Sequence, residues 1–263
     1  MKLVTCNSNN SLATSIAKKL KKPLCKCVIK RFADMEIFVE ILENVRGEDV
    51  FVIQSTSYPA NDNLMELLIT IDALKRGSAK RITAVVPYFG YARQDRKTGP
   101  RTPITAKLVS NLITNAGADR VLTLDLHAGQ IQGFFNVPVD ELTASSILAN
   151  KLKSIMKDKD DAVVVATDLG GAKIAREIAT ILNTSIAIAD KSRNDNSETV
   201  KSHNLIGDVA GRDAFIVDDE IGTGGTIEST VEVLKSNFVK NIYCAATHGV
   251  FSKNAIEKLS KLN

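Results

Sequence analysis

Short apolar runs rich in β-branched residues alternate along the chain with longer stretches of helical period. The first set is VFVIQ at 50–54, NLMELLITIDALKR at 63–76 and RITAVV at 81–86. This order is typical of βαβ units, in which helices connect parallel strands. Because the short runs are apolar throughout, we expect strands that are covered by helices on both faces.

The same rhythm continues toward the C-terminus. Further strands are predicted at RVLTLDL 120–126, AVVVAT 162–167, SIAIA 185–189, AFIVDD 214–219 and IYCAAT 242–247. There is also an internal echo between the two halves. The segments 46–56 and 79–89, with a helix between them, resemble the segments 210–220 and 239–251, which also have a helix between them. The pattern favours two related α/β halves that meet near residues 140–148, although any two βαβ units look somewhat alike.

Polar, titratable and glycine residues follow the predicted strands directly. These segments are STSYPAND, GYARQDRK, HAGQ, TDLGG, DDEIGTGG and THGVF. Ligands of open parallel sheets bind at the carboxyl ends of the strands. Six such segments in register therefore predict one composite polar site.

The loop at 220–226 has the residues of a phosphate site. Its glycines let backbone N–H groups turn inward, its threonines add hydroxyl donors, and the helix predicted at 227–236 contributes its positive end. Asp218 and Asp219 precede the loop. Because these carboxylates would repel phosphate, we expect them to accept hydrogen bonds from the hydroxyls of an attached ribose. The alternative is a plain turn from strand to helix.

Four other places in the sequence carry candidate chemistry. YARQDRKTGPR at 91–101 offers guanidinium groups that bind phosphate oxygens, or is an exposed basic loop. His127 and Asp168 each follow a strand and could touch a Mg²⁺ bound to polyphosphate, mostly through its waters, or could be core or capping residues. Residues 192–204 hold a single apolar side chain, and the segment is predicted to be a mobile loop, either an active-site lid or an insertion.

Composition narrows the class of protein. The chain has 263 residues with 44% hydrophobic and 24% charged residues, which is typical of a water-soluble protein, and 5% aromatic residues, which argues weakly against base stacking on nucleic acid. Its net charge of +4 is spread along the chain. Neither GxxxxGK[ST] nor GxGxxG occurs, which excludes a P-loop NTPase and an ordinary dinucleotide dehydrogenase.

The cellular location follows from what the sequence lacks. The four cysteines have no C-x-x-C spacing and suit buried thiols in a reducing compartment. The sequence contains neither a signal peptide nor an apolar run of membrane-spanning length. We expect a cytoplasmic protein with no nucleic-acid or membrane partner.

Several motifs resemble one enzyme family. VDDEIGTGG with Thr226 resembles the 5-phosphoribosyl-1-diphosphate (PRPP) loop shared by phosphoribosyltransferases and ribose-phosphate diphosphokinases. The remaining motifs resemble those of the diphosphokinase, PRPP synthetase: PYFGYARQDRK, RTPITAK, DLHAGQIQGFF, TDLGGAK and IGDVAGRD. The likeness runs from about residue 3 to the C-terminus.

The resemblance implies a fold and an activity. The fold would be α/β, with two similar phosphoribosyltransferase-like domains that each have a mostly parallel sheet flanked by helices. The first domain, 1–143, would lie on the ATP side. The second, 144–263, would lie on the ribose 5-phosphate side and is shorter than usual. The activity would be transfer of the β,γ-diphosphate of ATP to the 1-hydroxyl of ribose 5-phosphate, which gives PRPP and AMP for nucleotide biosynthesis. The alternatives are a non-catalytic regulatory subunit of the same fold and a true phosphoribosyltransferase.

The resemblance also implies roles for individual residues, in a homo-oligomer that uses Mg²⁺. The residues that match the ATP site are Arg93, Gln94 and Asp95, with Phe32, Asp34 and Glu36 as an adenine-contacting strip supplied by a neighbouring subunit. The residues that match the Mg²⁺ site are His127 and Asp168. The ribose 5-phosphate site corresponds to Asp218, Asp219, Thr223, Gly224, Gly225 and Thr226. Lys191 and Arg193 match the catalytic basic pair at the mouth of the 192–204 loop, which favours the lid interpretation.

The sequence departs from the family pattern at three positions. Gly222 stands where a third Asp is usual, Met35 replaces a usual Gly, and Glu220 occupies a commonly apolar position. The sequence also ends roughly fifty residues before family members usually do. We therefore expect a ribose site with one carboxylate fewer, and stability and assembly that differ from those of longer members.

Overall fold

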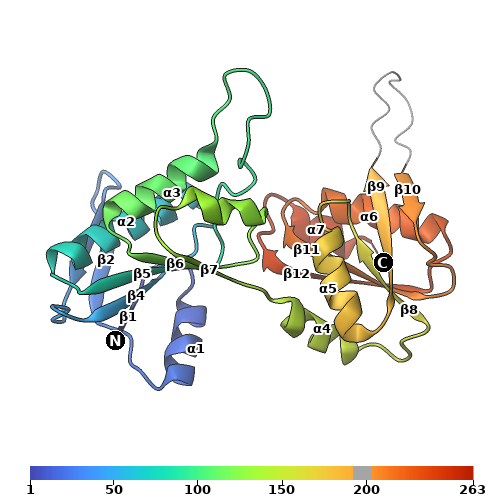
Figure 1. The fold of residues 1–263 in the computed structure, drawn as a ribbon, viewed down its shortest axis with the longest axis horizontal. Coiled ribbons are helices and arrows are strands. Elements are labelled where there is room, and N and C mark those ends of the chain that lie inside the picture. The colour runs from blue at the N-terminus through green and yellow to red at the C-terminus, as the bar shows by residue number, and fades with distance from the viewer. Residues whose placement is uncertain (192–202, 263) are drawn as a thin grey trace. The chain divides into compact units, whose positions relative to one another are not determined.

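The computed structural model describes residues 1–191 and 203–262. The chain divides into two compact units, Met1–Leu142 and Thr143–Asn263 (Figure 1). Each unit is an α/β structure in which a five-stranded sheet carries helices on both faces. No described helix, in either unit, has the length and apolar character needed to cross a membrane.

The sheet of the first unit is parallel throughout and has the order β1-β4-β5-β6-β7. Its elements are β1 (Lys2–Thr5), α1 (Asn10–Leu20), β4 (Asp49–Ile53), α2 (Ala60–Arg76), β5 (Arg81–Val86), α3 (Thr105–Ala116), β6 (Arg120–Leu124), a 3₁₀ helix η1 (Gly129–Phe134) and β7 (Val139–Leu142). Helices α2 and α3 cover one face of the sheet and α1 the other (Figure 1). All five residues from Ile82 to Val86 are buried, as the apolar run predicts.

A two-stranded antiparallel hairpin also belongs to this unit, and the hydrophobic pattern did not predict it. It consists of β2 (Cys27–Arg31) and β3 (Ile37–Ile41), and β3 packs against α2. Most of its side chains are only half-buried, and a charged residue is exposed at Glu40. A hairpin that lies on a helix in this way has neither the apolar run of a central strand nor a clean alternation.

The sheet of the second unit has the order β10-β9-β8-β11-β12, and only β10 is antiparallel to its neighbour. Its elements are α4 (Ser145–Lys153), β8 (Ala162–Ala166), α5 (Ala172–Leu182), β9 (Ser185–Lys191), β10 (His203–Ile206), β11 (Asp213–Ile221), α6 (Gly225–Ser236), β12 (Asn241–Gly249) and α7 (Ala255–Ser260). Helices α4 and α5 pack on one face, and α6 and α7 on the other (Figure 1).

Several predicted boundaries in this unit were wrong, and two of them adjoin the predicted site. The polar segment predicted as a loop to residue 204 ends earlier, because β10 begins at His203 and pairs with β9. Residues 192–202 of that segment lie outside the described residues. Strand β11 extends to Ile221, two residues past its predicted end, because it stays paired with β12 at Ile221 and Gly249.

The echo between the two halves of the sequence corresponds to repeated local structure. Gly47 precedes β4 and Gly211 precedes β11, and both have φ of +71°. The N–H of Gly47 donates to the carbonyl of Ser78 at 2.9 Å, and that of Gly211 donates to the carbonyl of Phe238 at 2.9 Å. Each bond ties the start of one strand to the end of the helix that follows it. Gly is needed at both positions because other residues rarely adopt this φ.

Candidate active site

The glycine turn of the second unit lies between β11 and α6. Gly224 adopts φ of +77° at the N-cap, and no side chain among the described residues caps this helix. A Cβ at Gly224 would lie 3.3 Å from Leu259 Cγ, so both conformation and space favour glycine. Thr223 and Thr226 are exposed on either side. An uncapped helix N-terminus presents backbone N–H donors and a positive dipole end, which is the arrangement that binds phosphate.

The predicted acid pair is the sixth and seventh of the nine residues of β11, and Glu220 and Ile221 separate it from this turn. Asp218 is half-buried and accepts hydrogen bonds from Thr167 Oγ1 at 2.8 Å and from the N–H of Asp219 at 2.9 Å. The pKa of Asp218 is raised to about 7, first by burial and then by the neighbouring Asp219 carboxyl, while the hydrogen bond from Thr167 acts to lower it. The pair can therefore accept hydrogen bonds close to the turn that can donate them.

Thr167 lies in the polar segment TDLGG of the sequence, but no role of its own was predicted for it. It is 4% exposed and follows β8 directly. Strands β8 and β11 are parallel neighbours, which brings Thr167 to Asp218 although they are 51 positions apart. The only signal in the sequence was its position after an apolar strand.

Asp168 lies at the same carboxyl edge of this sheet and is exposed. Its Oδ1 accepts a hydrogen bond from the N–H of Gly171 at 2.9 Å, just before α5 begins. Asp168 therefore shapes this turn, which is the kind of capping role weighed above against contact with Mg²⁺. Its carboxylate is also exposed to solvent.

In the first unit, Arg93, Gln94 and Asp95 follow β5. Arg93 and Gln94 are exposed. Gln94 supports the start of α3, because its Oε1 accepts from Thr105 Oγ1 at 2.6 Å and its carbonyl accepts from the N–H of Ala106 at 3.2 Å. The backbone of this segment is thus held by α3 while the Arg93 side chain reaches solvent.

A hydrogen bond joins this segment to the loop that carries His127. Gln130 Nε2, in η1, donates to Asp95 Oδ2 at 3.0 Å. His127 is exposed and lies three residues earlier, after β6. Because β5 and β6 are parallel neighbours, both segments lie at one edge of the sheet. The structure therefore brings Asp95 and the His127 loop together, as the sequence predicts for residues that follow adjacent strands.

The predicted adenine strip forms the tip of the β2–β3 hairpin. Phe32, Asp34 and Glu36 are exposed, and Asp34 Oδ1 accepts from the N–H of Glu36 at 3.2 Å. The ring of Phe32 packs edge-on against Phe38 with centroids 5.6 Å apart. Met35 adopts φ of +72°, a conformation that favours the glycine usual at this position in the family pattern.

The first turn of α2 contacts both the hairpin and the segment after β5. Arg31 pairs with Asp62 at 3.3 Å, and the Tyr91 hydroxyl bonds to Asn61 Oδ1. This turn therefore supports two of the predicted ATP-binding elements of the first unit.

Of the predicted catalytic pair, Lys191 is the last residue of β9, and Arg193 lies outside the described residues. Within residues 1–191 and 203–262, no three His, Cys, Asp or Glu side chains form a group able to hold a metal ion. A protein cage for a metal is therefore not part of the described structure.

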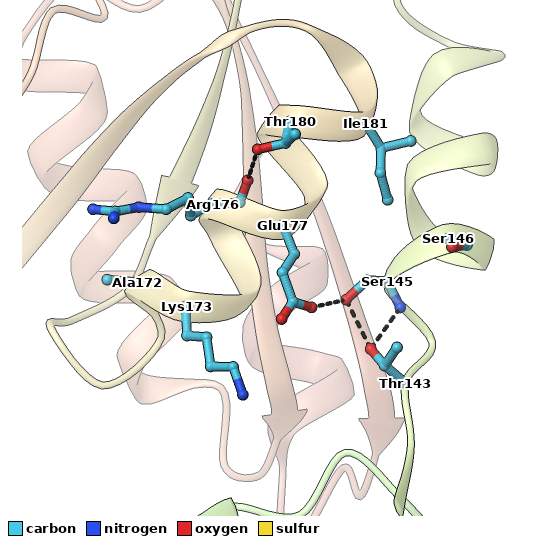
Figure 2. Close-up of a pocket in the computed structure, with 9 residues that line it drawn as sticks. All are labelled: Thr143, Ser145, Ser146, Ala172, Lys173, Arg176, Glu177, Thr180 and Ile181. Carbon is cyan, nitrogen blue, oxygen red and sulfur yellow. Dashed lines mark hydrogen bonds between the residues drawn. The ribbon is translucent and has the colours of Figure 1, made fainter.

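A groove of about 750 Å³ lies between α5 and the start of α4. Figure 2 shows Glu177 of α5 pointing toward Ser145, whose Oγ donates to Glu177 Oε2 at 2.9 Å, while Arg176 points away. None of the predicted site residues lines it. Its lining does include Ala172 and Lys173, which follow the turn that carries Asp168.

Comparisons with known proteins agree with these features. Residues 1–117 match the family model described as the N-terminal domain of ribose phosphate pyrophosphokinase, and residues 138–261 match that of the phosphoribosyl transferase domain. Ribose-phosphate pyrophosphokinases of Granulibacter bethesdensis and Agrobacterium fabrum are 58% and 56% identical to the chain over 260 residues, which is 99% of this chain and 83% of each relative. A crystal structure of phosphoribosylpyrophosphate synthetase from Mycobacterium smegmatis matches with a TM-score of 0.93 and 42% identity, over 100% of this chain and 85% of that one.

The fold and the site therefore define an α/β protein with two phosphoribosyltransferase-like domains. The chain belongs to the ribose-phosphate pyrophosphokinase family. The predicted fold class, family and ribose-phosphate diphosphokinase activity are confirmed. The comparisons give no support to the alternative, a non-catalytic regulatory subunit.

Proposed function

We propose that the second unit binds ribose 5-phosphate and that the first unit binds ATP, with the division between residues 1–143 and 144–263. The first assignment rests on the position of Asp218 and Asp219, on the strand that leads into the turn before the uncapped helix N-terminus at Gly224. Backbone N–H donors of Gly224, Gly225 and Thr226 suit a phosphate. The carboxylates suit the ribose hydroxyls, which are hydrogen-bond donors.

Arg93 would bind the phosphate oxygens of ATP, with Gln94 and Asp95 beside it. The hydrogen bonds that fix Gln94 and Asp95 support this role, because a held backbone positions an exposed guanidinium at low entropic cost. The exposed Phe32, Asp34 and Glu36 would contact the adenine of ATP bound to a neighbouring subunit. Phe32 is 48% exposed, which suits a ring that stacks on a partner outside its own unit. The active form is then a homo-oligomer.

The donor chemistry at His127 and Asp168 fits Mg²⁺ that arrives with ATP. Mg²⁺ usually keeps several waters and binds through one or two protein groups together with substrate phosphates. The imidazole of His127 and the carboxylate of Asp168, both exposed, suit this mode. When bound, Mg²⁺ would neutralise phosphate charge.

In the reaction, the 1-hydroxyl of ribose 5-phosphate attacks the β-phosphorus of ATP, the bond from that phosphorus to the α,β-bridging oxygen breaks, and AMP leaves. The protein contributes alignment and positive charge, because phosphoryl transfer needs little covalent participation by side chains. Lys191 and Arg193 would add charge where it develops on the transferred group and would help to exclude water, which competes as the acceptor. We place this reaction in the cytoplasm, in the synthesis of nucleotides.

The assignment is tested by AMP release from ATP that depends on ribose 5-phosphate, with PRPP formed in equal amount. Asp218→Asn should raise the KM for ribose 5-phosphate at least about tenfold and leave that for ATP nearly unchanged, because one charged acceptor is lost. Arg93→Ala should do the reverse. AMP release that does not need ribose 5-phosphate, or variants that affect the opposite substrate, would contradict the assignment.

A further inference from the structure

A buried threonine three residues past the end of β4 holds the segment that precedes Arg93. Thr56 is 1% exposed, and its Oγ1 accepts a hydrogen bond from the N–H of Gly90 at 2.7 Å and donates to the carbonyl of Tyr88 at 3.2 Å. The N–H of Thr56 also donates to the Tyr88 carbonyl at 2.9 Å. One residue therefore binds both ends of the Tyr88–Gly90 turn.

The fit between Thr56 and Gly90 leaves no room for a side chain. A Cβ at Gly90 would lie 2.2 Å from the Thr56 carbonyl oxygen, far inside a van der Waals contact. The two backbones can approach this closely because glycine has no Cβ, and the hydrogen bond to the Thr56 hydroxyl stabilises the contact. We call this arrangement, of Thr56 with Tyr88 and Gly90, the Thr56 clasp.

The strand side of the clasp is fixed by a buried polar network. Gln54, fully buried two residues earlier, donates from Nε2 to Glu66 Oε1 at 3.0 Å and accepts at Oε1 from the N–H of Ser8 at 3.0 Å. Glu66 is 5% exposed and also accepts from the N–H of Asn7 at 2.6 Å. Such a satisfied network makes the end of β4 a rigid support.

The other side of the clasp leads directly into the predicted ATP segment. Tyr91 follows Gly90 and adopts φ of +67°, and its carbonyl accepts from the N–H of Gln94 at 2.9 Å. Because this turn is short and closed by a hydrogen bond, the position of Gly90 determines the positions of Arg93 and Gln94. A shift at Gly90 therefore displaces the groups assigned to ATP.

We propose that Thr56 is a positioning residue that sets ATP affinity by fixing the Tyr88–Gly90 turn ahead of Arg93. It does not touch the nucleotide. The inference rests on the proposed function, in which Arg93, Gln94 and Asp95 bind ATP. Removal of the hydroxyl would leave the buried N–H of Gly90 without an acceptor, so the turn must shift to satisfy it.

The test compares Thr56→Val, which keeps the shape but removes the hydroxyl, with Thr56→Ser, which keeps the hydroxyl. For Thr56→Val we expect the KM for ATP to rise about tenfold, the size of effect expected for one unsatisfied buried donor, while the KM for ribose 5-phosphate stays within about twofold. Thr56→Ser should restore most of the ATP affinity. Calorimetric binding of a non-hydrolysable ATP analogue should show the same change. If Thr56→Val fails to fold, Thr56→Ala supplies the same loss of the hydroxyl.

Thr83→Val is a matched control in the same unit. Thr83 is 1% exposed on the neighbouring β5, and its Oγ1 has no hydrogen-bond partner among the described residues. The same chemical change there should leave both KM values unchanged. Thr83→Val therefore measures the effect of a buried threonine-to-valine change on its own.

Arg93→Ala, measured in parallel, separates the two claims. If it raises the KM for ATP and Thr56→Val does not, the clasp proposal is wrong and the ATP site stands. If neither variant changes the KM for ATP, the clasp proposal and the proposed ATP site are both wrong. The clasp proposal is also overturned if Thr56→Val raises both KM values equally, or if Thr56→Ser is as impaired as Thr56→Val.

Discussion

Thr167 Oγ1 donates a 2.8 Å hydrogen bond to Asp218 Oδ2, from the end of β8 to the neighbouring β11. This hydrogen bond favours the ionised carboxylate. Burial acts in the opposite direction and is the main reason that the pKa of Asp218 is raised to about 7. The same oxygen atoms are the ones proposed to accept hydrogen bonds from ribose. The protonation of Asp218 therefore connects the stability of the second unit to its binding of the substrate.

The first prediction concerns stability and pH. The unfolded carboxyl keeps its ordinary pKa of 3.8, so between about pH 4 and pH 7 the folded protein binds a proton at Asp218 that the unfolded chain does not bind. The contribution of this group to stability is full below pH 4 and is lost as pH rises to about 7. The free energy of unfolding of Asp218→Asn, compared with that of the wild type, should therefore increase as pH rises across this window. Denaturant unfolding at a series of pH values measures this difference.

Thr167→Val is the control for that prediction. Because the Thr167 bond lowers the pKa of Asp218, its removal should extend the loss of stability to higher pH, and it should have no such effect in the Asp218→Asn background. A stability difference between Asp218→Asn and wild type that stays constant from pH 4 to pH 8 would rule out a raised pKa.

The second prediction compares two glycines of the turn. Gly224→Ala must place a Cβ in the left-handed region and against Leu259, so we expect a loss of about 1–2 kcal/mol in the free energy of unfolding together with weaker ribose 5-phosphate binding. Gly225→Ala meets Thr223 Oγ1 only at 3.7 Å, an ordinary contact, and should keep its stability. Melting temperatures and substrate affinities of the two variants check this. Equal stability of both would contradict the conformational argument.

The third prediction concerns Lys191. If its charge acts in the transition state, Lys191→Ala should lower kcat by on the order of 10²–10³ and change the KM for ribose 5-phosphate much less. Lys157→Ala, at an exposed lysine of the same unit, should leave both parameters near the wild-type values. Equal losses in kcat and in substrate affinity for Lys191→Ala would show a binding role instead.

The fourth prediction tests the shared adenine site. At an ATP concentration near the wild-type KM, Phe32→Ala and Arg93→Ala should each lower the activity of an oligomer made of that variant alone. When the two are mixed and allowed to exchange subunits, some sites combine an intact hairpin with an intact Arg93 segment, so activity should return. A mixture no more active than its components would place both residues in one subunit's own site.

The sequence predicted those parts of the fold that follow from local pattern. Strands such as β5 and β8 are continuous apolar runs, and the residues after parallel strands must gather at one edge of a sheet, so the neighbourhood of Asp95 and the His127 loop could be foreseen. The turn at Gly224 could also be foreseen from its glycines, and Gly224 does adopt a positive φ, whereas its phosphate-binding role stays a prediction.

Other parts depend on contacts between distant segments. Thr167 bonds Asp218 of the neighbouring strand and Thr56 bonds Gly90 after the neighbouring strand, at separations of 51 and 34 positions, and each looks like an ordinary residue beyond a strand. The β2–β3 hairpin is only half-buried against α2 and carries no clear periodicity. The roles of Lys191, Arg193, Asp168 and the hairpin tip rest on the resemblance, and they stay predictions.

A crystal structure with ribose 5-phosphate bound tests the central claim most directly. The account predicts the phosphate within hydrogen-bond distance of the backbone N–H groups from Gly224 to Thr226, with ribose hydroxyls on Asp218 and Asp219. A phosphate bound elsewhere, with the turn at Gly224 empty or the hydroxyls pointing away from both acids, would contradict it.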